Sequence, residues 1–159
     1  MINILDKRIT RPNNATPYTP GDVVGGGGAD GTIEFVKAAA QAGGGGYIIC
    51  AQLITNNTVT LNGEFRLFIY NDVLLASADN TPYAVPVETG AEKCLIGYVD
   101  FVLNADGQGA TLKALAVQHN ANIAYKCSNT SLYGVLTATK GYIPAASMKF
   151  WVKLIVDQF

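Results

Sequence analysis

The sequence predicts an all-β protein: a single-domain, jelly-roll-like β-sandwich of about eight antiparallel strands. Short apolar or alternating segments recur roughly every 8 to 15 residues, and Gly, Asn, Asp and Pro turns separate them. No segment has a convincing long helical period. The 159 residues suit one domain that buries roughly 70% of the surface of its unfolded chain.

The strongest strand pattern lies in the last segment, residues 148–159. Its residues alternate between an apolar side, Met148, Phe150, Val152, Leu154 and Val156, and a more polar side, Lys149, Trp151, Lys153 and Asp157. A period of two predicts a β-strand with one face in the core and the other facing water or a partner. Such a strand needs neighbours for its backbone groups and a second layer for its apolar face.

The first 20 residues predict an extended N-terminal arm, followed by a sandwich domain over residues 21–159. Pro12, Pro17 and Pro20 place three prolines within nine residues, which forbids a helix and favours an extended backbone. Two alternatives stay open for this arm. It is either a frayed terminus or edge strand, or a strap across a neighbouring subunit.

The remaining strands follow in order along the chain. They are expected at residues 32–37, 47–55, 64–70, 94–103, 110–119, 122–127 and 131–139. Residues 110–119 also fit a helical face, but the strands around them favour a strand. Residues 37–42 are alanine-rich and fit one helical turn. Residues 71–92 form the longest irregular stretch, which makes them a candidate for function or contact.

Two glycine quartets, at residues 25–28 and 43–46, suggest mobile loops at one end of the sandwich. A phosphate-binding loop would require a following helix, and a P-loop would also require a Gly-Lys-Ser/Thr sequence. The segment after the first quartet is instead β-branched and aromatic. The glycines therefore predict turns and not a nucleotide site.

The composition excludes several classes of partner. Charged residues make up 14% of the chain, against roughly 25% in ordinary domains, and the net charge of −1 gives no footprint for nucleic acid or anionic lipid. No apolar run approaches the ~18 residues of a membrane span. Charge interrupts the first eight residues before any signal-peptide core, so we expect a protein of the cytoplasm. A neutral, apolar surface suits permanent assembly.

No pattern in the sequence predicts catalysis, a cofactor or a metal centre. His119 is the one histidine, without a partner motif for a triad or metal cluster, and pairs of acids such as Asp72 with Asp79 or Glu88 with Glu92 are expected by chance. Turn aspartates beside glycines leave a calcium site open; they are Asp22, Asp30 and Asp106. The odd, widely spaced Cys50, Cys94 and Cys127 are interpreted as buried thiols.

Trp151 is the most informative exposed candidate. It lies on the outward side of the last strand between Lys149 and Lys153, and Ile155 and Phe159 share that side. Aromatic and apolar residues in a row are typical of contact surfaces between subunits. A second sheet or loop that covers this row is the alternative. If the row is an interface, a charged residue in place of Trp151 should break the oligomer.

The order of motifs resembles that of small virion proteins, specifically tailed-phage capsid decoration (cement) proteins. The similarity runs along nearly the whole chain and rests on residues 9–12 (Ile-x-Arg-Pro), 18–25 (Tyr-Thr-Pro-Gly-Asp-Val-Val-Gly), 65–69, 79–80, 96–99, 132–136 (Leu-Tyr-Gly-Val-Leu), 141–144 (Gly-Tyr-Ile-Pro) and 150–154. The glycine quartets have no counterpart in it.

This resemblance implies a non-enzymatic structural protein that binds the outer surface of a phage capsid and stabilises the shell. Its partners would be the major capsid protein and copies of itself, often as a homotrimer, with assembly in the host cytoplasm and a final place on the virion. The contact residues expected from the resemblance and the patterns above are Ile4, Arg8, Arg11, Tyr18, Trp151 and Phe159.

Two other function classes remain open from the sequence. A carbohydrate- or receptor-binding module on a tail or fibre would use loop aromatics such as Tyr83 and Tyr142. A hydrolase on a jelly-roll scaffold would need convergent acids or a metal.

Overall fold

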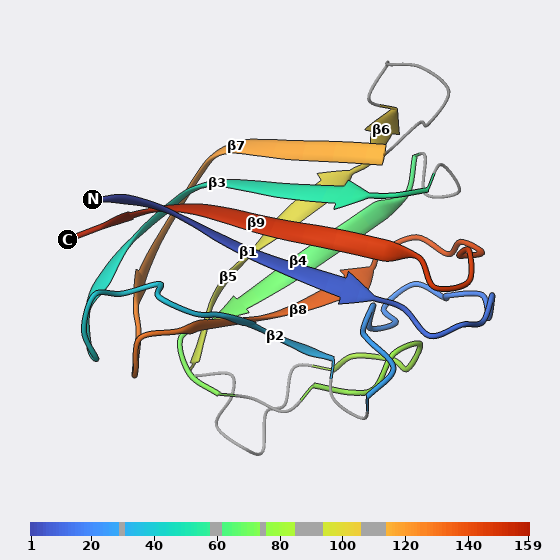
Figure 1. Ribbon diagram of the computed structural model, residues 1–159, viewed down its shortest axis with the longest axis horizontal. Coiled ribbons are helices and arrows are strands. Elements are labelled where there is room, and N and C mark those ends of the chain that lie inside the picture. The colour runs from blue at the N-terminus through green and yellow to red at the C-terminus, as the bar shows by residue number, and fades with distance from the viewer. Residues whose placement is uncertain (29–30, 58–61, 74–75, 85–93, 106–113) are drawn as a thin grey trace.

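The computed structural model describes residues 1–28, 31–57, 62–73, 76–84, 94–105 and 114–159, which form two packed β-sheets (Figure 1). The strands are β1 (Ile2–Thr10), β2 (Thr32–Phe35), β3 (Gly45–Thr55), β4 (Glu64–Tyr70), β5 (Leu95–Val102), β6 (Asn104–Ala105), β7 (Ala114–Lys126), β8 (Leu132–Ala138) and β9 (Lys149–Gln158). In the described part of the chain, no helix is long and apolar enough to span a membrane.

The strand order identifies the sandwich as a jelly roll. One sheet has the order β1-β9-β3-β7-β6 and the other the order β2-β8-β4-β5, and every pairing is antiparallel. Apart from the hairpins β4–β5 and β6–β7, successive strands lie in different sheets, and the last strand lies between the first and the third, as in a jelly roll built from two Greek keys. The predicted fold class is confirmed.

The core fills the space between the two sheets with the inward side chains of alternating strands. Phe65 of β4 and Phe150 of β9 meet edge to face, with ring centroids 5.6 Å apart. All seven residues of β8 are buried, because its outward face packs against a second, smaller cluster. That cluster contains Val23, Tyr70, Ala76, Tyr133 and Val135. The loop segments that supply Val23 and Ala76 therefore cover part of the four-stranded sheet.

The first residues of the chain lie against the sandwich. Ile2–Thr10 forms the edge strand β1, which pairs with β9 along its whole length, and its Leu5 and Ile9 are buried in the core. Beyond β1, the backbone N–H of Arg11 donates to the carbonyl of Met148 (2.9 Å), and Tyr18 bridges to Tyr142. This is the edge-strand alternative that the proline-rich sequence left open.

Two local predictions were wrong. Residues 37–42 form turns and bends instead of a helical turn, and Lys37 has a positive φ of 62°. The two strands predicted at 110–119 and 122–127 are one strand in the described part, β7, whose pairing with β3 is interrupted opposite Ile48 and Cys50. Asn120 and Asn122 adopt positive φ values of 58° and 48° there, so β7 bends without ending.

The glycine quartets lie at opposite ends of the sandwich, contrary to prediction. Gly26 lies beside Thr10 at one end, whereas Gly46 pairs with Gln158 at the other. Gly46 belongs to β3, and a Cβ atom there would lie 2.1 Å from the carbonyl oxygen of Asp157. Glycine is required at this position because the backbone of β9 comes too close for a side chain, and not because the position lies in a loop.

Candidate interaction surface

The outward face of the five-stranded sheet presents three rows of side chains that cross four strands. From β1 through β9 and β3 to β7, the rows are Arg8–Trp151–Ile54–Leu115, Asp6–Lys153–Gln52–Val117 and Ile4–Ile155–Cys50–His119. We call these residues the outward face. The rows exist because the period of two in each strand places every second residue on the same side, and the registers align those residues.

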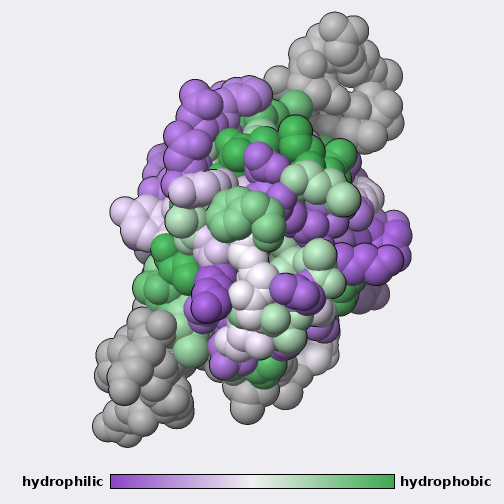
Figure 2. All heavy atoms as spheres, turned by 90° about the vertical axis from the view of Figure 1, so that its left-hand side faces the viewer, coloured by the Kyte–Doolittle hydropathy of each residue, from purple (hydrophilic) through white to green (hydrophobic). Residues whose placement is uncertain are grey.

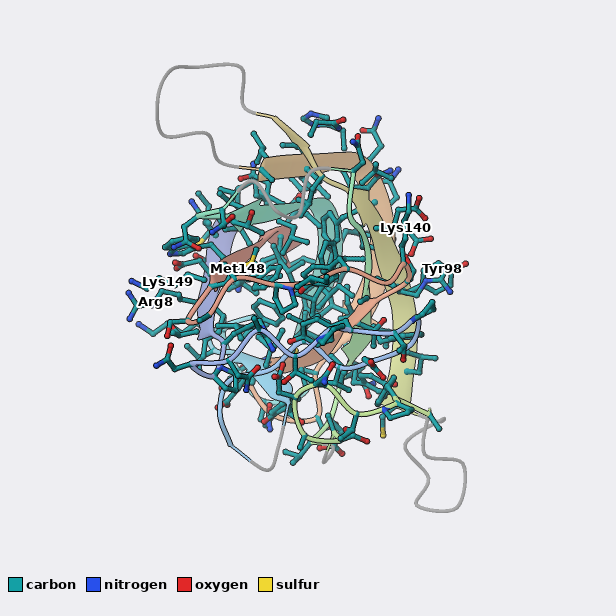
Figure 3. All side chains as sticks on the ribbon, turned by 90° about the vertical axis from the view of Figure 1, so that its right-hand side faces the viewer. Arg8, Tyr98, Lys140, Met148 and Lys149 are labelled. Carbon is teal, nitrogen blue, oxygen red and sulfur yellow. The ribbon has the colours of Figure 1, made fainter. Side chains whose placement is uncertain are left out.

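The outward face combines two mainly apolar rows with a mainly polar row between them, and it is not part of either core cluster. Ile4 is 61% exposed, and Trp151, Ile155 and Ile54 are partly exposed. Both core clusters lack these four residues, which therefore belong to the partly exposed surface of the described part of the chain. Arg8 and Lys149 project from this side of the molecule, and Tyr98 and Lys140 project from the opposite side (Figure 3).

The apolar surface continues to the end of the sandwich where both chain ends lie (Figure 1). Phe159 is 82% exposed, and its ring packs against that of Tyr47 with centroids 5.7 Å apart. Ile2 and Met1 are also exposed. Figure 2 looks onto this end and shows hydrophobic and hydrophilic side chains side by side. A mixture of apolar and polar side chains is typical of non-obligate protein–protein interfaces.

Arg11 and Tyr18 are buried in the folded protein and do not lie on this surface. Each is only 2% exposed. Arg11 Nη2 lies 3.2 Å from the Asp79 carboxylate, while its Nε donates to the Tyr18 hydroxyl, which donates to Asp79. The backbone N–H of Gly25 also donates to Asp79, at 2.9 Å. Burial, and next the hydrogen bond to Asp79, raises the pKa of Tyr18 far above its usual value.

The loop aromatics considered for carbohydrate binding pack against other rings. Tyr142 stacks on Tyr18 with centroids 4.9 Å apart, and Tyr83 packs on Phe68 at 5.4 Å and shares a hydrogen bond with the Tyr70 hydroxyl. Burial raises the pKa of both Tyr142 and Tyr83. These rings stabilise the chain itself.

The described residues hold no group of three or more His, Cys, Asp or Glu side chains that would bind a metal. Asp22 is buried and accepts hydrogen bonds from the Thr19 backbone (2.6 Å) and hydroxyl (2.9 Å), as turn aspartates do. Asp30 and Asp106 lie outside the described residues, as do Glu88 and Glu92. His119 is exposed on β7. Cys50 and Cys127 are buried thiols, as predicted, whereas Cys94 is only partly buried.

Comparison with known proteins finds solved structures of similar fold but assigns this chain to no family. No family model matches the chain, and no curated protein matches it. A chain of the Israeli acute paralysis virus full particle, heated to 63 degrees, is 9% identical over 98% of this chain and 68% of its own, with a TM-score of 0.48. A chain of the cyanophage Pam1 capsid asymmetric unit is 11% identical over 98% and 83%, with a TM-score of 0.33.

A carbohydrate-binding module has a similar score. The C-terminal CBM6 of the laminarinase LamC from Zobellia galactanivorans is 10% identical over 96% of this chain and 99% of its own, with a TM-score of 0.35. Likenesses at this level carry no argument about function, because one fold supports many functions. The function has to be argued from the surfaces of this chain.

The buried tyrosines predict a loss of stability at alkaline pH. Burial raises the pKa of Tyr125 to about 12, and Tyr18 and Tyr142 are shifted in the same direction, whereas an unfolded tyrosine has a pKa of about 10. Between these values the unfolded chain loses protons that the folded chain retains. We therefore expect the contribution of these tyrosines to the free energy of unfolding to be constant below about pH 9 and to fall between about pH 10 and 12.

Urea titrations at several pH values, with tyrosinate absorbance as a second probe, test this expectation. An equal free energy of unfolding at pH 8 and about pH 11 would contradict it.

Proposed function

We propose that this chain is a non-enzymatic structural protein of a virion, which binds the outer surface of a phage capsid and stabilises the shell. Its partners are the major capsid protein and further copies of itself, most simply as a trimer at a three-fold position. The observation that supports this best is the outward face, with its two mainly apolar rows, on a rigid jelly roll. A decoration protein needs such a contact surface and needs no catalytic group or cofactor.

The size of the outward face favours many contacts over one strong contact. Three rows across four strands span roughly 15 by 15 Å, or a few hundred Å². A stable pair of proteins buries about 800 Å² on each partner. One copy of this face therefore binds weakly, and a symmetric shell that presents many identical sites converts weak contacts into a stable coat.

Four of the six expected contact residues remain candidates for this role: Ile4, Arg8, Trp151 and Phe159. Ile4, Arg8 and Trp151 belong to the outward face, and Phe159 extends it toward the chain ends. Arg11 and Tyr18 are buried in the chain, so we assign them to stability. Trp151 is the strongest candidate because large aromatic side chains dominate the binding energy of many interfaces.

The Trp151→Glu variant tests this proposal in purified virus particles. We expect the wild-type chain to be present in a number comparable to that of the major capsid protein, and the variant to be reduced at least about ten-fold. The reason is that a carboxylate between Arg8 and Ile54 would have to lose its water on binding. Quantitative mass spectrometry of the particles measures both numbers.

Ile143→Glu is the matched control, because Ile143 is an apolar residue, 66% exposed, that lies outside the three rows. It should leave the copy number unchanged. A handful of wild-type copies per particle would instead place the chain in the neck, tail or fibre, and its absence would overturn the virion proposal. An unchanged copy number for Trp151→Glu would show that another surface binds the shell.

A further inference from the structure

A groove of about 820 Å³ lies between β5, an edge strand of the four-stranded sheet, and the part of β7 beyond Leu115, where β6 does not pair with it. Consecutive residues of each strand line it, residues 98–102 of β5 and 115–118 of β7. Because consecutive side chains of a strand point to opposite faces, a run of consecutive lining residues means that the backbone edges of both strands face the groove.

The hydrogen bonds at the end of β4 fix which backbone groups of β5 point toward β4. The N–H of Leu103 donates to the carbonyl of Gly63 at 2.9 Å, and the N–H of Thr139 donates to the carbonyl of Glu64 at 2.9 Å. Glu64 therefore points its carbonyl away from β5, toward β8. Hydrogen-bonded pairs recur at every second residue, so Val99 and Phe101 direct their N–H and C=O groups toward β4.

The intervening residues Tyr98, Asp100 and Val102 consequently direct their N–H and C=O groups away from β4. Asn104 Nδ2 donates to the carbonyl of Val102 at 3.2 Å from this outer side, which agrees with that direction. In the described ranges, β5 pairs with β4 alone, and the peptide groups of Tyr98 and Asp100 have no other backbone partner. These two residues present donors and acceptors at the edge of the groove.

The groove has an apolar floor and a polar rim. Val99, Phe101 and Ala116 line it and are at most 7% exposed, while Asp100, Gln118 and Asn120 supply polar groups.

The two ends of the groove limit its length. At one end Ile123 packs over Gly97, where a Cβ atom would lie 3.4 Å from its side chain, and at the other end β6 pairs with Leu115. The open segment of β5 is therefore Tyr98–Val102, about 16 Å long.

Edge strands usually avoid pairing with other chains through lysine, proline or bulges. The edge strand β1 contains Asp6, Lys7 and Arg8, and β7, which β6 leaves open beyond Leu115, bends at Asn120 and Asn122. β5 contains neither Lys nor Pro. Its one charged residue, Asp100, is held by Arg66 of β4 in a two-point ion pair of 2.6 and 2.8 Å. The pairing of β5 with β4 is irregular between Leu95 and Gly97, but the segment Tyr98–Val102 pairs in regular register and lacks these protective features.

We propose that β5 accepts an extended segment of another polypeptide as an additional strand. Main-chain hydrogen bonds to Tyr98 and Asp100 would hold the segment, and an apolar side chain would contact the floor beside Phe101. The partner is thus a peptide segment with alternating apolar and polar residues. A sugar fits less well, because Arg66 lies 3.9 Å from the ring centroid of Tyr98 and covers one face of the aromatic ring on the rim. This inference goes beyond the proposed virion role and does not depend on it.

Amide hydrogen exchange of the isolated chain, measured by NMR, tests the proposal. The probe is a capped peptide of alternating Thr and Val residues with a lysine at each end. We expect exchange at Tyr98 and Asp100 to slow at least about ten-fold on addition of the peptide, while Val99 and Phe101, already bonded to β4, change little. The same peptide with N-methyl groups at alternate residues should have no effect.

A variant that fills the groove provides a second test of the proposal. Gln118→Trp on β7 should abolish the protection, and Lys126→Trp, on the same strand but outside the groove, should retain it. Unchanged exchange at Tyr98 and Asp100, protection by the methylated peptide, or full protection in Gln118→Trp would overturn the proposal. Binding of a soluble glucan oligosaccharide in the groove, with no effect of the peptide, would overturn it in favour of a sugar site.

Discussion

We expect the Asp79→Ala variant to lose about 3 to 5 kcal/mol of its free energy of unfolding. The Arg11 side chain is fully buried and Asp79 is its ion-pair partner, so the substitution leaves a guanidinium charge inside the protein without a counter-charge. Tyr18 and the Gly25 N–H lose their acceptor at the same time. Urea unfolding followed by tryptophan fluorescence measures the difference.

Asp100→Ala is the matched control, because it removes an aspartate that pairs with an arginine at the surface. The Arg66 and Asp100 side chains are 33% and 53% exposed, and exposed pairs contribute about 0 to 1 kcal/mol. The double variant Arg11→Met/Asp79→Ala should recover part of the loss, since no unpaired charge remains buried. Equal losses for Asp79→Ala and Asp100→Ala would show that the buried pair contributes no more than a surface pair.

The second large effect is expected at Phe150, which is fully buried between the sheets. Phe150→Ala removes a ring that contacts Phe65 edge to face and leaves a cavity beneath β9, so we expect a cost of about 3 to 5 kcal/mol. The melting temperature of a chain of this size should fall by on the order of 10 °C. Calorimetry or circular dichroism measures it.

Trp151→Ala is the control for this variant, because Trp151 follows Phe150 on the same strand and points to the outward face. The Trp151 ring is partly exposed and its removal leaves no closed cavity between the sheets, so we expect a smaller loss than for Phe150→Ala. If Trp151→Ala destabilised the chain as much as Phe150→Ala does, the assignment of the two faces of β9 would be wrong.

Strands were predictable where the sequence pattern is local. Residues 64–70 were expected as a strand and form β4, Glu64–Tyr70, and residues 148–159 include β9, Lys149–Gln158. Alternation of apolar and polar residues determines which side faces the core without reference to any other part of the chain. The outward position of Trp151 follows from the same alternation.

The pairing of distant residues was not predictable. Arg11 and Asp79 are separated by 68 positions, and neither sits in a periodic pattern, so no local signal indicated that Arg11 would be buried. The continuity of β7 was likewise not predictable, because His119-Asn120-Ala121-Asn122 resembles a turn. Its asparagines adopt positive φ values at little cost and let the strand continue through a bulge. The open edge of β5 depends on strand order, which no single segment encodes.

The position of β9 between β1 and β3 also affects how the protein can form during synthesis. Ile2 pairs with Asp157, and Gly46 pairs with Gln158, so β1 can pair only after β9, which is synthesised much later. The four-stranded sheet, by contrast, contains no strand later than β8. Until residues 149–158 have left the ribosome, β1 has no neighbour and β3 exposes an unpaired edge. Domains with such long-range pairings fold slowly and are open to aggregation during this interval.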